Sequence, residues 1–287
     1  MSPASRRHHL GQHFLRHPGA IARIVAAAEL SAADTVVEVG AGTGILTVPL
    51  ARAAGRVLAV EVDRHLIPRL TERLAAEGLA NVEVVERDIL RFDFEEAAHA
   101  HGRFKVVGNL PYSVSTQVMF RLLAAKAHVP LAVLMFQREV ADRISAPPGG
   151  KDYGIISVLI QQTALVERVM DLAEKHFQPP PKVKSAVLKL LFPLLPPVPV
   201  VGEAMFARVV KAAFGQRRKT LHNALRALGM PEGALAAGLE AAGIDPGLRA
   251  ERLSVADFAG LTAELAARGL GAGQELGTES GTESGTE

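Results

Sequence analysis

The chain has 287 residues, of which 48% are hydrophobic, and its formal net charge is +2. A chain of this length can form two domains, each with a sizeable core. It contains no cysteine, which excludes disulfides, thiolate nucleophiles and cysteine-ligated metal centres. No segment holds about eighteen consecutive apolar residues, and the start lacks the apolar stretch of a secretion signal, so we expect a cytoplasmic protein with no membrane partner.

The end of the chain differs in composition from the rest. Residues 271–287 repeat Gly, Thr, Glu and Ser with little apolar surface to bury, which predicts a disordered low-complexity tail. The four Glu of this tail are its only charges, so the preceding body has a net charge of about +6. Such a body permits a polyanionic partner without requiring one.

Strand-like and helix-like segments alternate through the first half. Residues 20–30 place Ile21, Ile24, Val25 and Ala28 on one face, which predicts an amphipathic helix. Apolar, β-branched runs follow at 35–39, 57–62, 82–85, 105–107 and 131–136, with segments of helical length at 44–54, 64–77 and 115–126. Alternation of strand and helix predicts an α/β fold with a parallel sheet.

The second half divides into two regions. Apolar runs at 155–169 and 185–192 are expected to add strands to the sheet, and three prolines at 179–181 exclude helix between them. A stiff proline-rich connector at 192–199 then precedes a purely helical pattern over 203–269. We therefore expect a sheet domain at 20–195 and a small helical domain at 196–270.

Three successive predicted strands end in residues suited to a nucleoside ligand. Gly40, Gly42 and Gly44 follow the first strand and let backbone approach a ligand closely, although such a loop is also compatible with a structural turn. Glu61 ends the second strand, where a carboxylate can accept hydrogen bonds from ribose hydroxyls. Asp88 follows the third and is suited to an adenine amine; either acid alone is compatible with a solvated strand end.

A fourth strand end carries Asn109-Leu110-Pro111-Tyr112. The Asn109 amide oxygen and the Leu110 carbonyl can accept the N–H groups of an exocyclic amine, Pro111 fixes the turn, and Tyr112 offers a face for stacking. Taken alone, the four residues also fit a proline turn with a packing tyrosine. With the three preceding strand ends, they predict a site for a planar, amine-bearing base.

These motifs resemble those of class I S-adenosylmethionine-dependent methyltransferases that act on exocyclic amines, with a Rossmann-like domain. A more specific resemblance, over roughly residues 10–260, is to small-subunit ribosomal RNA adenine dimethyltransferases of the KsgA (RsmA) type. It also rests on Gly11-Gln12-His13-Phe14-Leu15, Phe136-Gln137-Arg138-Glu139-Val140, Tyr153-Gly154, the segment from Phe177 to Val187, and the segment from Phe214 to Thr220.

The resemblance implies dimethylation of the N6 amines of two adjacent adenosines in small-subunit ribosomal RNA, within a pre-30S particle, by a monomer whose action is coupled to ribosome assembly. It implies S-adenosylmethionine contacts at Gly40, Gly42, Gly44, Glu61, Asp88, Ile89 and Asn109, and at His13 and Leu15 from a basic segment at 1–19. It also implies that Phe177 stacks on the target adenine opposite Tyr112. The family usually has Asn in place of His13 and commonly Asp in place of Lys184.

A basic stretch in the helical region is expected to contact RNA. It comprises Arg208, Lys211, Arg217, Arg218, Lys219 and Arg226, with no acid between Glu203 and Glu232. A solvated helix surface is the alternative reading. Arg6, Arg7 and Arg16 form a second cluster. His9, His13 and His17 have helical spacing, but no acid or cysteine completes a metal site, so no metal is expected.

Three other functions are open. A large-subunit ribosomal RNA methyltransferase of the erythromycin-resistance type uses the same base-clamp chemistry, although the helical domain and the segment from Phe214 to Thr220 favour the small-subunit enzyme. A dehydrogenase is disfavoured by the glycine spacing and by Asn109 to Tyr112. A non-enzymatic ribosome-assembly factor is disfavoured by the intact set of Glu61, Asp88, Asn109 and Tyr112.

Overall fold

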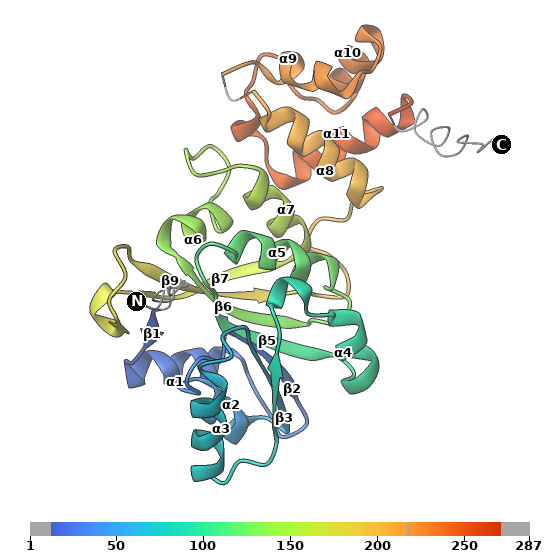
Figure 1. The fold of residues 1–287 in the computed structure, drawn as a ribbon. Coiled ribbons are helices and arrows are strands. Elements are labelled where there is room, and N and C mark those ends of the chain that lie inside the picture. Colours follow the sequence, from blue (N-terminus) through green and yellow to red (C-terminus); the bar gives the residue numbers. More distant parts are fainter. Residues whose placement is uncertain (1–12, 217, 271–287) are drawn as a thin grey trace, which may run out of the picture. The chain divides into compact units, whose positions relative to one another are not determined.

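The computed structural model describes residues 13–216 and 218–270, and its chain divides into two compact units (Figure 1). Of the described residues, one unit contains 13–145 together with 163–197, and the other contains 146–162 together with 198–216 and 218–270. The predicted tail, Arg6, Arg7, His9 and Arg217 lie outside the described residues. None of the described helices is both long and apolar enough to cross a membrane.

The first unit is built on a seven-stranded sheet of strand order β4-β3-β2-β5-β6-β9-β7. Its strands are β2 (Thr35–Val39), β3 (Arg56–Glu61), β4 (Val82–Glu86), β5 (Phe104–Asn109), β6 (Leu131–Gln137), β7 (Leu165–Leu172) and β9 (Ser185–Leu191). The five strands from β4 to β6 in this order are parallel, whereas β9 pairs antiparallel with both β6 and β7. The sheet is thus the expected α/β sheet with an antiparallel extension.

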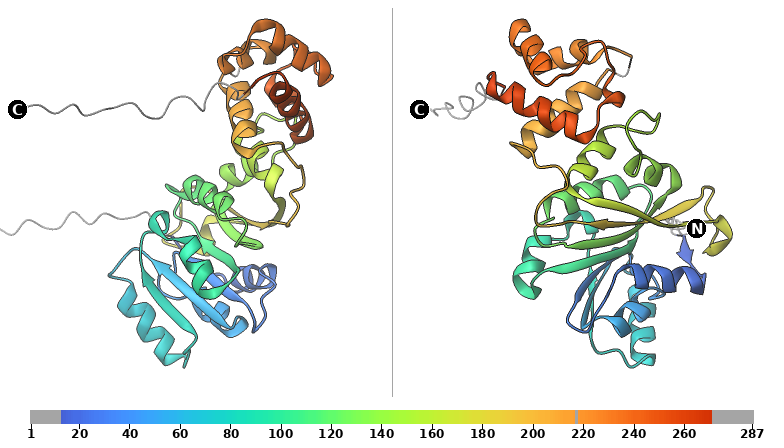
Figure 2. Two further views of the ribbon diagram at one scale, coloured as in Figure 1. Left: turned by 90° about the vertical axis from the view of Figure 1, so that its right-hand side faces the viewer. Right: turned by 180° about the vertical axis from the view of Figure 1, so that it is seen from behind.

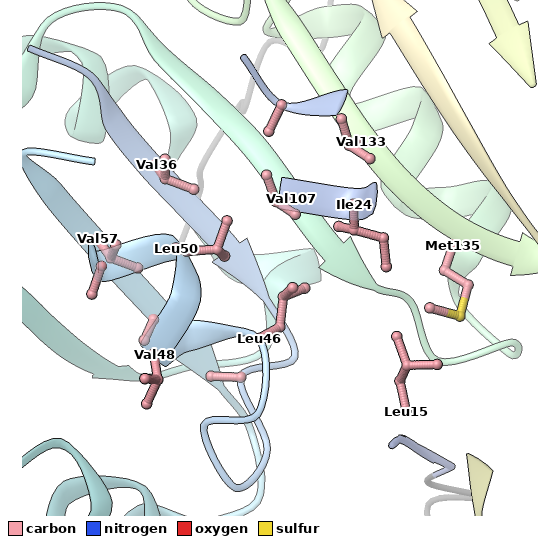
Figure 3. Close-up of a cluster of buried hydrophobic side chains, with 14 of the residues drawn as sticks. Leu15, Ile24, Val36, Leu46, Val48, Leu50, Val57, Val107, Val133 and Met135 are labelled. Carbon is pink, nitrogen blue, oxygen red and sulfur yellow. The ribbon is translucent and has the colours of Figure 1, made fainter. Parts of the chain in front are cut away.

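Helices cover both faces of this sheet, as Figure 2 shows. The unit contains α1 (Pro18–Ala27), α2 (Thr47–Ala53), α3 (Ile67–Ala76), α4 (Phe94–His101), α5 (Ser115–Ala124) and α6 (Arg138–Ile144). On one face, Val36, Val57, Val107 and Val133 of the strands pack in one cluster with Ile24 and Leu50 of the helices (Figure 3). Val37 and Leu58, which alternate with them, are also buried, as a sheet covered on both faces requires.

The apolar run at 155–169 differs from the sequence prediction, because its first part is helical. Residues Ile155–Thr163 form α7, and only Leu165–Leu172 form a strand. Ile155, Val158 and Leu159 recur at the helical spacing and pack into the core of the second unit. The run is rich in β-branched residues, which suggested a strand, but its period of 3.6 decides the structure.

The second unit is helical, as the pattern over 203–269 predicts. Besides α7 it contains α8 (Glu203–Phe214), α9 (Leu221–Leu225), α10 (Glu232–Ala241) and α11 (Val255–Ala267). Gly229 adopts a φ of 73° after α9 and its following turn, where a glycine ends a helix at little cost. Ser254 and Asp257 form a capping box that begins α11.

The close approach of β5 to β2 at Gly108 yields a stability prediction. A Cβ at this position would lie 2.6 Å from the Val39 carbonyl oxygen and 2.8 Å from the Val39 Cβ. We expect Gly108→Ala to lower the free energy of unfolding by about 1–3 kcal/mol through this clash, and therefore to lower the melting temperature measured by circular dichroism.

Gly260→Ala is the control, because a Cβ at this position on α11 meets no atom within 4 Å. It should be neutral, or raise stability by about 0.5–1 kcal/mol as alanine replaces glycine in a helix. A melting temperature of Gly108→Ala equal to or above that of the unmodified chain would contradict the argument.

Candidate functional site

A cavity of about 970 Å³, counting its open mouth, lies where the parallel strands end. It is lined by ten of the predicted site residues, namely His13, Gly40, Gly42, Glu61, Asp88, Ile89, Asn109, Leu110, Pro111 and Tyr112. Seven further residues complete the lining, namely Phe14, Val39, Val60, Val62, Arg87, Ser113 and Val114. These seven were missed, although each adjoins a recognised motif.

The glycine loop after β2 forms one wall of the cavity. Gly40 and Gly42 adopt φ angles of 75° and 58°, a region that other residues rarely adopt. A Cβ at Gly42 would lie 2.9 Å from the Phe14 ring, so the loop tolerates no side chain there. Gly44 also has a positive φ, but it does not line the cavity; a Cβ there would lie 2.9 Å from Leu70.

Glu61 is held by backbone donors at the end of β3. Its Oε2 accepts a 2.7 Å hydrogen bond from the Gly42 N–H, and its Oε1 accepts from the N–H groups of Val62 and Asp63 at 2.9 and 2.8 Å. A carboxylate has about four lone-pair sites, and these bonds occupy three of them. Glu61 can therefore accept two ribose hydroxyls only if some of these backbone bonds open.

Asp88 and Ile89 line the cavity beyond β4. Asp88 begins the short 3-10 helix Ile89–Arg91, and its Oδ1 accepts a 2.9 Å hydrogen bond from the Leu90 N–H. Ile89 is buried. The pair thus offers a carboxylate edge and an apolar face, which is a suitable surface for an adenine ring.

The turn after β5 presents the amide and the aromatic ring. The Asn109 Nδ2 donates a 2.9 Å hydrogen bond to the backbone carbonyl of His13. Because this bond uses an N–H, the Asn109 Oδ1 is the atom suited to accept a hydrogen bond from a ligand. The Tyr112 hydroxyl forms a 2.7 Å hydrogen bond with Ser185 Oγ, and burial raises the pKa of this phenol, which keeps it neutral.

Leu15 and Phe177 do not line the cavity. They face each other in a two-stranded ribbon formed by β1 (Phe14–Leu15) and β8 (Phe177–Gln178), and both side chains are buried in the hydrophobic core. The Phe177 ring, at 3% exposure, offers no open face to a base in this conformation. Its predicted place opposite Tyr112 requires the ring to turn out of the core.

The basic residues of the second unit differ in how free their charges are. Arg208 donates a hydrogen bond to the Leu228 carbonyl, and Arg226 lies 3.6 Å from Glu232, an acid that the sequence separates from the basic stretch. Lys211, Arg218, Lys219 and Arg226 are exposed, and the Arg226 side chain keeps 64% exposure beside Glu232. These four are therefore better placed to contact phosphate than Arg208.

Two of the histidines with helical spacing, His13 and His17, take part in hydrogen bonds. His13 Nδ1 lies 2.8 Å from the Pro179 carbonyl oxygen, and His17 Nδ1 caps α1 by accepting from the Ala20 N–H. Within residues 13–216 and 218–270, no three His, Asp or Glu side chains gather as metal ligands.

Glu38 is a buried acid on β2 beneath the glycine loop. Burial raises the pKa of its carboxyl to about 8, the Glu61 charge adds to the shift, and the Thr47 hydroxyl opposes it. Thr47 makes no well-formed hydrogen bond among the described residues, and neither does Glu38 Oε2, so burial decides the direction. Glu38 is therefore largely protonated at neutral pH.

The cavity suits S-adenosylmethionine. Gly40 and Gly42, with their positive φ angles, line the cavity with backbone, and the acids stand at successive strand ends of the same edge. A parallel sheet extended by antiparallel strands, with this loop and these acids, defines a class I S-adenosylmethionine-dependent methyltransferase.

Comparison with known proteins makes the class more specific. A family model described as ribosomal RNA adenine dimethylase matches residues 4–267, and the chain belongs to this family. Proteins named ribosomal RNA small subunit methyltransferase A, from Thiobacillus denitrificans and Geobacter sulfurreducens, are each 44% identical to it. Each alignment covers 91% of this chain, and 98% and 95% of the respective relative.

Two solved structures share the fold over almost their whole length. A dimethyladenosine transferase from Plasmodium falciparum matches with a TM-score of 0.76 at 28% identity, covering 90% of this chain and 99% of that one. The 23S rRNA methyltransferase ErmE matches with a TM-score of 0.71 at 26% identity, covering 88% and 99%. The fold expected from the sequence is confirmed.

The raised pKa of Glu38 predicts a pH-dependent stability. In the unfolded chain this carboxyl titrates near its ordinary value of 4.5, whereas in the folded chain it titrates near 8. Its contribution to stability is therefore complete below about pH 4.5 and is lost as the pH rises through about 8. Glu38→Gln stays neutral and should lack this loss. Between pH 5 and pH 9 the unmodified chain should therefore lose a few kcal/mol of unfolding free energy that the variant does not lose.

Urea denaturation of the cofactor-free protein at the two pH values measures this difference. Glu83→Gln is the control, since the Glu83 side chain is 54% exposed and its variant should follow the unmodified chain. Parallel pH dependences for Glu38→Gln and the unmodified chain would show that Glu38 is ionised in the fold.

Proposed function

We propose that this chain dimethylates the N6 amines of two adjacent adenosines in small-subunit ribosomal RNA, with S-adenosylmethionine as methyl donor. The observation that carries the catalytic part is the Asn109 amide, which a hydrogen bond to the His13 carbonyl orients within the cavity. The substrate rests on the relatives named ribosomal RNA small subunit methyltransferase A, which are 44% identical over nearly the whole chain.

The cofactor is proposed to lie along the three strand ends that line the cavity. When bound, it would supply an electrophilic methyl carbon: a nucleophile would attack this carbon in line with its bond to the positively charged sulfur, and a neutral thioether would leave. Gly40 and Gly42 would hold its methionine and ribose portions closely, Glu61 would accept ribose hydroxyls after releasing backbone donors, and Asp88 with Ile89 would hold its adenine. His13 would close the cavity from the amino-terminal side.

The target amine needs orientation because its lone pair is delocalised into the adenine ring. Acceptance of its N–H groups by Asn109 Oδ1 and the Leu110 carbonyl would favour a tetrahedral nitrogen with its lone pair directed at the methyl group. Pro111 holds these acceptors in place, and the Val114 N–H closes the turn with a 3.1 Å hydrogen bond to the Pro111 carbonyl. Orientation and exclusion of water are then the main contributions of the protein.

The base is proposed to stack on Tyr112, whose hydroxyl is anchored by Ser185. Withdrawal of an adenosine from structured RNA costs about a few kcal/mol, which stacking offsets. Phe177 would add the second face once its ring leaves the core, so base binding and the Phe177 rotation would be linked.

The RNA is proposed to extend over the exposed cations of the helical unit, Lys211, Arg218, Lys219 and Arg226, with Arg217 beside Arg218 in sequence. The substrate is proposed to be a pre-30S particle in the cytoplasm, bound by a monomer. A large-subunit substrate is the second candidate, because ErmE also shares the fold. The 44% identity to small-subunit enzymes favours the first.

The orienting role of Asn109 predicts a separation of binding from catalysis. Asn109→Ala removes the amide acceptor but leaves the exposed cations unchanged, so methylation should fall by at least about a hundredfold. RNA affinity, measured by filter binding, should stay within about twofold. Weakened RNA binding with normal turnover would contradict the mechanism. Ser113→Ala serves as the control, because it removes an exposed hydroxyl from the cavity lining and leaves the amide acceptor in place, so methylation should persist.

The substrate is tested with labelled S-adenosylmethionine and three substrates: undermethylated 30S particles, 50S particles and free ribosomal RNA. We expect label in adenosines of the small-subunit RNA, and two methyl groups per modified base by mass spectrometry. Label confined to the 50S particles would replace the proposal with the large-subunit function. Tight RNA binding without any label would indicate an assembly factor that lacks turnover.

A further inference from the structure

The loop between β8 and β9 projects from the catalytic unit beside the cavity. We call residues 179–184 the proline loop, because Pro179, Pro180 and Pro181 stiffen it. Its tip is exposed at Lys182, Val183 and Lys184, and the Val183 side chain is exposed by 42%. An aliphatic side chain between two lysines is thus presented to the surroundings.

Two hydrogen bonds join the proline loop and the residue after it to the cavity wall, and a third joins the loop to the start of α6. The Pro179 carbonyl oxygen lies 2.8 Å from His13 Nδ1, and Ser185, which follows the loop, bonds to the Tyr112 hydroxyl at 2.7 Å. His13 and Tyr112 both line the cavity. The Lys184 carbonyl also accepts a 2.9 Å hydrogen bond from the Arg138 N–H. The loop is therefore a fixed part of the rim at the place where a target base would enter.

The charges of the proline loop are not balanced by nearby acids in the sequence. No Asp or Glu occurs from residue 175 to residue 202. Lys189 on β9 is buried and paired with Glu29, whereas Lys182 and Lys184 form no ion pair among the described residues. The neighbouring Arg138 side chain is 49% exposed and lies 3.7 Å from Asp142. The loop tip thus keeps two uncompensated positive charges.

We propose that the proline loop binds the RNA strand next to the target adenosine. Lys182 and Lys184 contact the flanking phosphates, and Val183 packs against the base adjacent to the one that is withdrawn. An apolar side chain inserted beside an unstacked base, with cations on the backbone, is an established way to hold a distorted nucleic acid. The inference rests on the proposed function, because it concerns how the same site receives its substrate.

The charge part of the proposal is tested with the double variant Lys182→Ala/Lys184→Ala of the full chain. Two lost phosphate contacts on single-stranded RNA should lower the salt slope of RNA binding by about 1.4, which is about tenfold in affinity near 150 mM salt. The KM for undermethylated 30S particles should rise by a similar factor, while kcat changes less than about twofold, since no group at the reacting atoms is altered.

The matched control is Arg56→Ala/Arg103→Ala. Arg56 begins β3 and Arg103 precedes β5. Both cations therefore lie at the amino ends of the parallel strands, whereas the cavity lies at their carboxyl ends. This variant removes the same charge and should leave the salt slope and KM unchanged. An equal effect of the two double variants would overturn the proposal, because it would reflect net charge alone.

The apolar part is tested with Val183→Ser. This variant should lower kcat about fivefold with little change in RNA affinity, because loss of the wedge affects the withdrawn state of the base. An unchanged kcat would show that Val183 does not hold the withdrawn state of the base. Melting temperatures equal to that of the unmodified chain would exclude a folding defect in any of these variants.

Two comparisons separate this inference from other outcomes. The slope is measured on protein-free small-subunit RNA as well as on particles, and an effect seen only with particles would overturn an RNA contact in favour of a ribosomal protein. Methylation by the unmodified chain tests the proposed function, whereas the salt slope of RNA binding is measured without any methylation. Absence of methylation would therefore count against the proposed function, and an unchanged salt slope would count against the proline loop as an RNA contact.

Discussion

The parallel register of three strands is the constraint on which the site depends. Val39 of β2 stands opposite Val60 of β3 and Gly108 of β5. The residues that come next along the chain are Gly40 after β2, Glu61 at the end of β3 and Asn109 at the end of β5. Residues distant in the sequence therefore line the cavity side by side. Because backbone hydrogen bonds fix this row, the acceptors for cofactor and target share one rigid frame. The bare Cα of Gly108 permits the close strand approach.

The walls of the cavity are joined by hydrogen bonds between segments that are far apart in the chain. The backbone carbonyl of His13 accepts a hydrogen bond from Asn109 Nδ2. The imidazole ring of His13 is in hydrogen-bond contact with the Pro179 carbonyl oxygen through Nδ1. The contact of the His13 carbonyl with Asn109 involves only backbone atoms of residue 13, so it does not depend on the identity of the side chain there. The His13 ring adds a separate link to the proline loop.

Features that depend on residues close together in the sequence could be predicted, whereas features that depend on contacts between distant residues could not. The strand ends and their acids were found because glycines and carboxylates after apolar runs are local signals. Residues 155–163 were assigned to a strand because β-branched composition outweighed a helical period whose packing partners lie beyond residue 198. The burial of Phe177 and the backbone donors around Glu61 are tertiary contacts, which composition and spacing do not encode.

The fold and the cavity do not distinguish between ribosomal subunits. The dimethyladenosine transferase and ErmE match this chain with TM-scores of 0.76 and 0.71, and both alignments cover nearly all of their lengths. Acceptors that orient an adenine amine serve any RNA that delivers the base, so the choice of RNA must depend on surfaces outside the cavity. Arg208 contributes less to such a surface, because it already donates to the Leu228 carbonyl, whereas the Arg226 side chain is 64% exposed. Cations on phosphates position an RNA without reading its bases, so the choice of RNA depends on how the shape of the RNA fits the arrangement of these exposed cations.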